Sequence, residues 1–376
     1  MQQKIITAAD NYKDLDYWII NNGLDRVLLV CGNSIERQTI NGYLQTVKER
    51  FGVDIVRFMD FTPNPSYESV QKGVKVFHDE GCQGIIAVGG GSSMDVAKCI
   101  KLFSNMNGKG EHGSWLKQEA IPNKIPFLAV PTTAGTGSEA TRFAVIYYDG
   151  AKQSITSESI IPQTVLMDSG VLKTLPEYQK KATMMDALCH AIESYWSVNS
   201  TAESKQYSKQ AIQMILANMQ GYLVNTDEGN AGMLIAANMA GKAINITQTT
   251  AGHAMCYKIT SLFGCAHGHA AILCDRALYP WMIDNAECCC DPRGVQYLAG
   301  VLDEIGQTLG CANAKQGAQR LKQIFDTLEL EVPSATAEQF RELQTSVNPV
   351  RLRNHPIMLT PETIDELYHQ ILREKK

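Results

Sequence analysis

The stretch from Gly84 to Phe103 constrains the fold more than any other part of the chain. Residues 84–88 form an apolar run of strand length, residues 89–91 are three consecutive glycines, and residues 92–103 carry apolar side chains at helical spacing. This order is typical of a parallel α/β unit, in which glycine N–H groups and a helix N-terminus can hold a phosphate. Because the glycines do not match the G-x-G-x-x-G fingerprint, a plain tight turn stays an alternative.

Similar strand patterns surround this stretch at 24–31, 57–61 and 127–130. The last of them runs into Pro131–Glu139, a loop rich in hydroxyl side chains and glycines that would suit a polar ligand, or else is a Ser/Thr-rich surface turn. The carboxyl ends of parallel strands meet at one sheet edge, where ligands collect. We therefore predict an α/β fold with an N-terminal Rossmann-like, parallel-sheet domain over residues 1–181 that binds a nucleotide.

Strand patterns disappear after Pro176. Apolar residues at helical spacing then predict helices over 182–198, 203–224, 231–246, 252–262, 294–309, 315–328 and 361–373. The second half is therefore predicted to be an all-helical domain over residues 182–376. A cleft between the two domains is expected to bring their ligands together.

Size and composition exclude several classes. A chain of 376 residues favours two domains, and a net charge of −5 with 19% charged residues gives no electrostatic case for nucleic acid or a membrane surface. No apolar run approaches the ~20 residues of a membrane span. The start of the chain has no signal-peptide pattern, and eleven scattered cysteines favour reduced thiols, so we expect a cytoplasmic protein. The tract Cys288–Cys290 is interpreted as a loop.

Asp186 and His190 lie four residues apart in a helical pattern, so both side chains leave one helix face. In apolar sequence such a pair needs a partner, and a divalent cation would be one. His253 and His267 are the other candidate ligands, and one carboxylate with three imidazoles suits Fe(II) or Zn(II). The alternative is a surface Asp/His pair with two unrelated histidines.

With these residues in view, the chain resembles the iron-dependent (group III) alcohol dehydrogenase family nearly from end to end. Five segments carry the resemblance: Gly89–Lys98, Pro131–Glu139, Asp186–Glu193, the pair His253 and His267–Gly268, and Arg351–Pro356. The resemblance implies an NAD(P)-dependent, metal-containing alcohol dehydrogenase or aldehyde reductase with Asp186, His190, His253 and His267 as ligands. The cofactor-binding residues it implies are Gly32, Asn33, Ser34, Asn64, Gly90, Gly91, Ser92, Asp95, Thr132, Thr133, Ser138, Thr141 and Lys152.

Two positions depart from the family pattern. Members that prefer NAD often carry an acid at the end of the first strand, which would repel a 2′-phosphate; here Gly32, Asn33 and Ser34 follow that strand, with Arg37 nearby. We therefore expect NADP(H) to be accepted and preferred over NAD(H). Many members also have a histidine proton relay four residues after the third ligand. This chain has Tyr257 there, and His269 is the other candidate for the proton transfer.

The run Thr247–Met255 and the segment Arg142–Tyr147 look most like the phosphonoacetaldehyde reductases of this family. We expect Arg142, Thr247, Thr250 and Lys258 to bind a small polar, anionic aldehyde and yield 2-hydroxyethylphosphonate. Alternatively the threonines bond back along their helix. Reduction of lactaldehyde, succinate semialdehyde or 3-hydroxypropanal, a dehydroquinate-synthase-like lyase and a non-catalytic nucleotide-binding protein stay open. A homodimer is the expected assembly.

Overall fold

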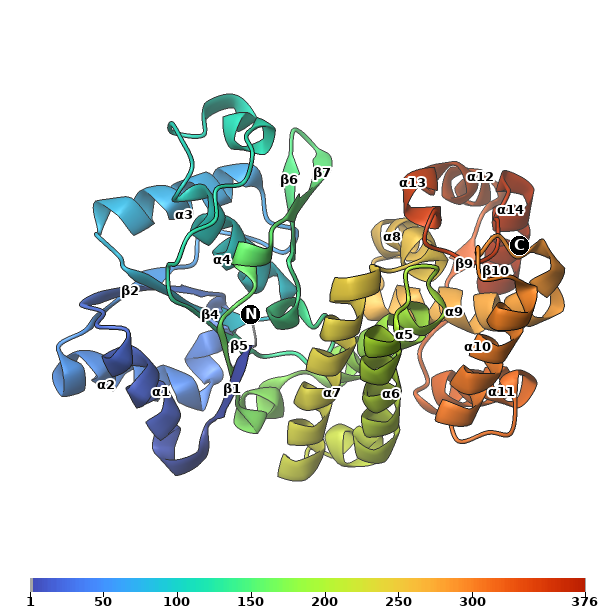
Figure 1. Cartoon of the computed structure of the whole chain (residues 1–376), viewed down its shortest axis with the longest axis horizontal. Helices are drawn as coiled ribbons and strands as arrows, with labels where there is room; N and C mark the ends of the chain where they lie inside the picture. Colours follow the sequence, from blue (N-terminus) through green and yellow to red (C-terminus); the bar gives the residue numbers. More distant parts are fainter. Residues whose placement is uncertain (1–2, 376) are drawn as a thin grey trace. The chain divides into compact units, whose positions relative to one another are not determined.

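A computed structural model describes residues 3–375. Contacts divide the chain into two compact units (Figure 1). The N-terminal unit comprises the residues up to Thr133, Gly137–Leu175 and Asn225–Leu234, and the C-terminal unit comprises Ala134–Thr136, Pro176–Val224 and the residues from Ile235 onward. A functional domain boundary between residues 181 and 182 stays a prediction.

The N-terminal unit is built on a six-stranded sheet with the order β1-β8-β5-β4-β2-β3, in which every neighbouring pair is parallel. Its strands are β1 (Lys4–Thr7), β2 (Arg26–Cys31), β3 (Asp54–Phe58), β4 (Gly84–Gly89), β5 (Phe127–Pro131) and β8 (Thr164–Met167). The central strands β2, β4 and β5 are buried almost throughout, which explains their continuous apolar runs. The predicted Rossmann-like class is confirmed.

Four helices cover this sheet, two on each face (Figure 1). They are α1 (Ala9–Asn21), α2 (Thr39–Phe51), α3 (Tyr67–Asp79) and α4 (Gly91–Phe103). Alternate residues of the strands pack with α3 and α4 in one apolar core, which includes Leu28, Ile85 and Ile100. An antiparallel hairpin of β6 (Phe143–Tyr148) and β7 (Ala151–Thr156) follows the second glycine-rich loop and packs on α4.

The C-terminal unit is helical apart from one pair of two-residue strands, β9 (Ser334–Ala335) and β10 (Arg373–Glu374), which the sequence analysis did not predict. Its helices are α5 (Glu177–Trp196), α6 (Ala202–Leu223), α7 (Asp227–Thr247, whose first residues group with the N-terminal unit), α8 (Ala251–Phe263), α9 (His267–Asp284), α10 (Val295–Thr308), α11 (Ala314–Thr327), α12 (Ala337–Ser346), α13 (Pro349–Leu352) and α14 (Pro361–Ile371). The helix α5 packs against α6 and α9, and α8 packs against α9.

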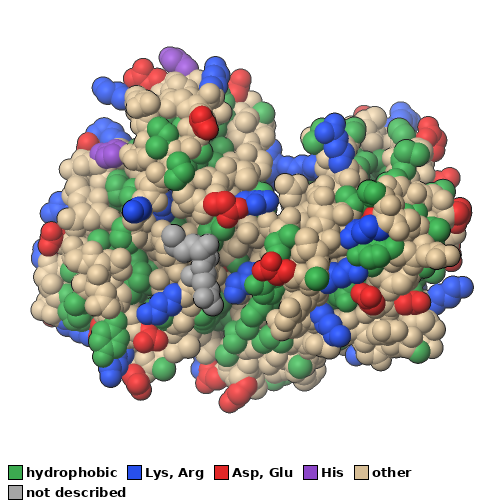
Figure 2. Space-filling view, in the orientation of Figure 1, with side chains coloured by type: hydrophobic (Ala, Val, Ile, Leu, Met, Phe, Trp, Pro, Cys, Tyr) green, Lys and Arg blue, Asp and Glu red, His purple; other side chains and the backbone are tan. Residues whose placement is uncertain are grey.

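The sequence patterns gave no prediction for β1, β8, the β6–β7 hairpin, α1, α9, α12 or α13, and the strand predicted at 57–61 was wrong in its bounds, because β3 ends at Phe58. The most important omission is α9, which carries Pro280 inside an otherwise continuous helix and begins at a candidate metal ligand. None of the helices described in residues 3–375 is long and apolar enough to cross a membrane. Acidic and basic side chains are interspersed over the face shown in Figure 2.

Candidate metal centre and nucleotide loops

Three polar side chains share one face of α5. Asp186, His190 and Glu193 are separated by four and three residues, so they project in the same direction from successive turns. All three are buried. A helix that is buried over most of its length normally carries apolar residues there, so this polar face requires partners from other elements.

Those partners come from α8 and α9. One donor atom each from Asp186, His253 and His267 lie within 4.8 Å of one another, and Nε2 of His253 is 3.4 Å from Oδ1 of Asp186. The Nε2 atom of His190 is 4.0 Å from the same oxygen, and its ring stacks on that of His253 with centroids 4.5 Å apart. The structure thus brings together the four residues that the resemblance implied as ligands.

The donor atoms fit a bound cation. Although they are buried, Oδ1 of Asp186 and Nε2 of His253 have no hydrogen-bond partner. Burial would raise the pKa of the Asp186 carboxyl, but the surrounding imidazoles of His190, His253 and His267 outweigh it and hold that pKa well below its usual range. A carboxylate and histidine nitrogens facing one point are the ligands that Fe(II) and Zn(II) accept.

Close approach of α9 to α5 depends on Gly268, which follows the candidate ligand His267. A Cβ atom at Gly268 would lie 2.1 Å from the carbonyl oxygen of Ala182 and 2.5 Å from Cβ of Asp186. Any side chain there would push His267 away from Asp186, so this glycine is a geometric requirement of the cluster.

Glu193 holds His253 in place and was not assigned a role in the sequence analysis. Its carboxylate accepts hydrogen bonds from the backbone N–H of His253 at 3.0 Å, from Nδ1 of the same residue, and from the N–H and hydroxyl of Thr250. With Nδ1 donating to Glu193, Nε2 is left as the nitrogen that faces Asp186. The spacing of Glu193 from Asp186 and His190 on one helix face was the signal that could have identified it.

A second buried carboxylate, Asp275, lies beside Glu193. Both Asp275 oxygens lack a hydrogen-bond partner, and a Cβ atom at Gly252 would lie 1.9 Å from Oδ1 of Asp275 and 2.7 Å from Oε1 of Glu193. Burial and the neighbouring Glu193 raise the pKa of Asp275 well above its ordinary value. Burial of the two carboxyls side by side thus favours the negative charge on Glu193, which has donors from His253 and Thr250, over Asp275, which has none.

The two candidate proton-transfer residues lie in different surroundings. The ring of Tyr257 stacks on that of His267 with centroids 5.3 Å apart, and its hydroxyl accepts a hydrogen bond from Nη1 of Arg351 at 3.1 Å. His269 instead bonds through Nδ1 to the hydroxyl of Tyr178 and through Nε2 to the carbonyl oxygen of Glu331. Both nitrogens of His269 are thus occupied, whereas Tyr257 adjoins the metal cluster.

The four residues predicted to bind substrate all make internal contacts. The Thr247 hydroxyl lies 2.9 Å from the Ser194 hydroxyl and 3.3 Å from the carbonyl oxygen of Ala243 one turn back, and the latter is the alternative that the sequence left open. The Thr250 hydroxyl lies between Trp196 Nε1 and Glu193. The Lys258 ammonium pairs with Glu342 at 2.5 Å. Arg142, in the N-terminal unit, pairs with Glu158 at 2.7 Å. Their role towards substrate stays a prediction.

In the N-terminal unit, the three glycines run from the last residue of β4 to the first residue of α4. Gly89 has a φ of 157°, and a Cβ atom there would lie 2.1 Å from Oγ of Ser93. Gly90 is the N-cap of α4, and a Cβ atom there would be 3.3 Å from Thr133 of the second loop. The first turn of α4 contains no acid, so the backbone N–H groups near Ser92 and the positive helix end suit a phosphate.

A buried lysine joins α4 to the second loop. The Lys98 ammonium donates to the hydroxyls of Ser138 and Thr141, both at 3.1 Å, and to the carbonyl oxygen of Phe143 at 2.7 Å, while the Ser138 hydroxyl donates to Asp95 at 3.2 Å. Burial lowers the pKa of Lys98 to about 8, against the opposing effect of Asp95 and Glu139. Asp95, Ser138 and Thr141 were predicted to bind the cofactor, whereas Lys98 had no assigned role.

The other predicted cofactor residues also lie in the N-terminal unit. Gly32, Asn33 and Ser34 follow the carboxyl end of β2, where Asn33 and Ser34 are exposed at the start of a short 3₁₀ helix. The Thr132 N–H donates to the carbonyl oxygen of Gly89 at 3.0 Å, which joins the two loops. Asn64 adopts a left-handed conformation with φ of 56°, and Lys152 lies on β7.

Two family profiles match the chain. The one described as iron-containing alcohol dehydrogenase covers residues 2–169, and the one for the C-terminal part of the same family covers residues 180–372. The chain belongs to the iron-containing alcohol dehydrogenase family. This confirms the resemblance on which the sequence-based ligand set rested.

Among relatives in this family, the chain is 30% identical over 288 residues to the phosphonoacetaldehyde reductase of Streptomyces viridochromogenes, covering 71% of this chain and 72% of the relative. It is 33% identical over 222 residues to the NAD-dependent methanol dehydrogenase of Bacillus methanolicus, and that match spans 58% of either chain. The solved structure of sulfoacetaldehyde reductase from Bifidobacterium kashiwanohense in complex with NAD+ has a similar fold. It superposes with a TM-score of 0.85 at 23% identity, covering 98% of this chain and 96% of that one.

Proposed function

We propose that this protein is a metal-dependent, NAD(P)H-linked aldehyde reductase that converts phosphonoacetaldehyde into 2-hydroxyethylphosphonate. The observation that carries the catalytic part is the convergence of Asp186, His190, His253 and His267, in which the buried Oδ1 of Asp186 and Nε2 of His253 have no hydrogen-bond partner. Membership of the iron-containing alcohol dehydrogenase family supports the reaction class. The reaction transfers a hydride equivalent from the nicotinamide to the carbonyl carbon and a proton to the oxygen.

Asp186, His190, His253 and His267 would hold Fe(II) or Zn(II). Such a cation, when bound, supplies Lewis acidity towards a carbonyl or hydroxyl oxygen. The protein's own contribution is to orient the ligands: Glu193 fixes the ring of His253, and Gly268 allows His267 to reach Asp186. Tyr257, which stacks on His267, is our candidate for donating the proton to the product oxygen.

The N-terminal unit would bind the nicotinamide cofactor. The Gly89–Gly91 turn and the start of α4 suit the pyrophosphate, and Lys98 holds the second loop against α4. Exposed Asn33, Ser34 and Arg37 at the end of β2 offer hydrogen-bond donors and one positive charge. The nearest acid, Glu36, is already paired with Arg57 at 2.7 Å. These features support a preference for NADP(H) over NAD(H).

The substrate assignment is supported by the phosphonoacetaldehyde reductase at 30% identity. Its test is a substrate panel on anaerobically purified protein of known metal content, with NADPH oxidation followed by absorbance. We expect phosphonoacetaldehyde to have a higher kcat/KM than butanal, lactaldehyde, succinate semialdehyde and 3-hydroxypropanal. A higher value for any of these four aldehydes would reject the phosphonate assignment, and protein without bound metal or activity would reject the enzyme class.

A further inference from the structure

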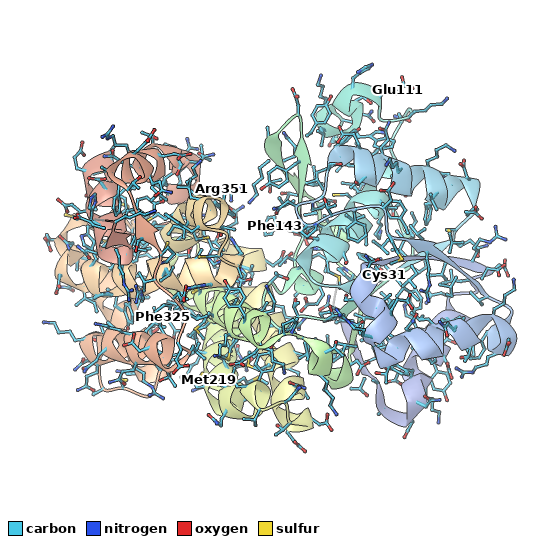
Figure 3. All side chains as sticks on the ribbon, turned by 180° about the vertical axis from the view of Figure 1, so that it is seen from behind. Cys31, Glu111, Phe143, Met219, Phe325 and Arg351 are labelled. Atoms are coloured by element: carbon cyan, nitrogen blue, oxygen red, sulfur yellow. The ribbon has the colours of Figure 1, made fainter. Side chains whose placement is uncertain are left out.

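Arg351 is a partly buried cation beside the metal cluster. It lies on the short helix α13, which packs against α8, and it is labelled in Figure 3. Its Nη1 donates to the hydroxyl of Tyr257 at 3.1 Å, and its guanidinium carbon lies 4.9 Å from the centroid of the Tyr257 ring. The phenol therefore fixes the position of the guanidinium by a hydrogen bond and a cation–π contact.

One aromatic ring separates this charge from a candidate metal ligand. Tyr257 is in contact with Arg351 and stacks on His267, and the planes of the two rings are inclined by 28°. All three residues belong to the C-terminal unit. The guanidinium of Arg351 and the ring of the candidate ligand His267 thus contact the same phenol ring, which puts a positive charge near the metal cluster.

The charge of Arg351 has no protein counter-ion. Within residues 3–375 no carboxylate oxygen lies within 4 Å of its guanidinium nitrogens, whereas Lys258 pairs with Glu342, Arg293 with Asp291 and Arg142 with Glu158. A guanidinium presents five N–H donors in a planar fork, and a neutral phenol oxygen uses only one of them. The remaining donors match the geometry of a phosphonate, sulfonate or carboxylate.

We propose that Arg351 recognises the anionic group of the substrate and that Tyr257 is the positioning residue for its guanidinium. The proposal rests on the proposed function, since it places the anion end of the aldehyde whose carbonyl is reduced at the metal cluster. Arg351 replaces Lys258 and Arg142 as the candidate anion-binding residue, because Glu342 and Glu158 compensate the charges of those two side chains. A dianionic phosphonate would gain most from the guanidinium fork.

The test compares Arg351→Gln and Arg351→Lys with the wild type and with Arg353→Gln, a control at an exposed arginine two residues away. The readout is the ratio of kcat/KM for phosphonoacetaldehyde to that for butanal, which cancels changes in metal loading. Loss of a hydrogen bond to a charged group predicts a ratio about 10- to 100-fold lower for Arg351→Gln. Arg351→Lys should be intermediate, and Arg353→Gln should match the wild type. Equal ratios for Arg351→Gln and Arg353→Gln would overturn the proposal.

A second readout separates this proposal from the substrate assignment. Methylphosphonate should inhibit butanal reduction competitively with respect to the aldehyde in the wild type, and at least tenfold more weakly in Arg351→Lys, the variant more certain to fold. If the wild type is so inhibited but does not reduce phosphonoacetaldehyde, the anion site stands and the assigned substrate is wrong. If phosphonoacetaldehyde is the preferred substrate but inhibition is equal in both proteins, the role of Arg351 is wrong and the function stands.

The positioning role of Tyr257 has its own signature. Tyr257→Phe keeps the ring on His267 but removes the hydroxyl that accepts from Arg351. Because Tyr257 is also the candidate proton donor, kcat should fall for both aldehydes, whereas a positioning role predicts that KM rises several-fold more for phosphonoacetaldehyde than for butanal. Equal KM changes for both aldehydes would show that the hydroxyl does not act through Arg351.

Discussion

The carboxylate of Glu193 binds His253 at two points, the backbone N–H at 3.0 Å and the ring nitrogen Nδ1. The opposite ring nitrogen then faces Asp186 at 3.4 Å. A histidine held in this way has its tautomer and its ring orientation fixed before a metal binds. The metal centre is therefore prepared by a residue that does not itself belong to the ligand set.

Glu193→Gln should weaken metal binding by about 10- to 100-fold, because the amide no longer carries the charge that orients His253. Competition with a chromophoric chelator under anaerobic conditions measures the affinity. Glu304→Gln, which changes a surface glutamate of the same unit paired with Lys205, is the matched control. Equal affinity in both variants would mean that Glu193 does not orient the ligand.

Asp186→Ala should abolish metal retention and turnover, because it removes the only carboxylate among the four proposed ligands. Binding of NADPH should persist, since the predicted nucleotide residues lie in the N-terminal unit. Metal analysis and cofactor fluorescence on the same sample give both results. Full activity in this variant would show that Asp186 is not a metal ligand required for turnover.

Gly32→Asp should reverse the cofactor preference. A Cβ atom at Gly32 meets no heavy atom within 4 Å and its φ of −94° suits any residue, so the substitution fits without strain. The new carboxylate would repel a 2′-phosphate and accept hydrogen bonds from a ribose. We expect the ratio of kcat/KM for NADPH to that for NADH to fall by at least about tenfold. An unchanged ratio would show that the 2′-position of the cofactor lies elsewhere.

Lys98→Met should destabilise the protein by about 2–4 kcal/mol, because three acceptors and the carboxylate of Asp95 lose a buried cation. NADPH affinity should fall as well, since Ser138 and Thr141 are no longer tied to α4. Denaturant unfolding and fluorescence titration measure the two effects. Lys75→Met, at an exposed lysine of α3, should change neither.

His355→Phe should make the protein less sensitive to acid. Burial lowers the pKa of His355 to about 4, only partly opposed by Glu193, and neither ring nitrogen has a hydrogen-bond partner. Between the ordinary pKa of 6.5 and about 4 the unfolded chain binds a proton that the folded chain does not, so this residue lowers stability as the pH falls through that range.

This pKa difference corresponds to a loss of at most about 3 kcal/mol in the free energy of unfolding between pH 7 and pH 4. The His355→Phe variant should not show this loss. Urea unfolding at the two pH values measures it, with the exposed His78→Phe as the control. A wild type and a His355→Phe variant with parallel pH dependence would show that His355 accepts its proton in the folded state.

The two glycine-rich loops illustrate what local sequence can reveal. The three glycines were placed correctly where a buried strand passes into a helix, because burial and helical periodicity are properties of adjacent residues. The function of Lys98 was not visible in the same way. Its partners are 40 to 45 residues away, on the loop after β5 and on β6.

Substrate recognition also depends on contacts that local sequence does not predict. Thr247, Thr250, Lys258 and Arg142 carry suitable donors, yet the fold supplies each of them with an internal partner. Arg351 was noted only as part of a family-like tail, and its position beside Tyr257 follows from the packing of α13 on α8. The availability of a charge depends on its neighbours in space, which sequence spacing does not give.

The amino-acid sequence alone determined the α/β class, the order of the strand–turn–helix units and the shared helix face of Asp186 and His190, because each of these depends on residues within a few turns of one another. Tertiary structure decided that Glu193 orients His253, 60 residues away, and that Arg351 contacts Tyr257, which stacks on His267. Those relationships depend on how α5, α8, α9 and α13 pack against one another. The periodicity of a sequence predicts which side chains share one helix face, but it does not predict which side chains of different helices meet.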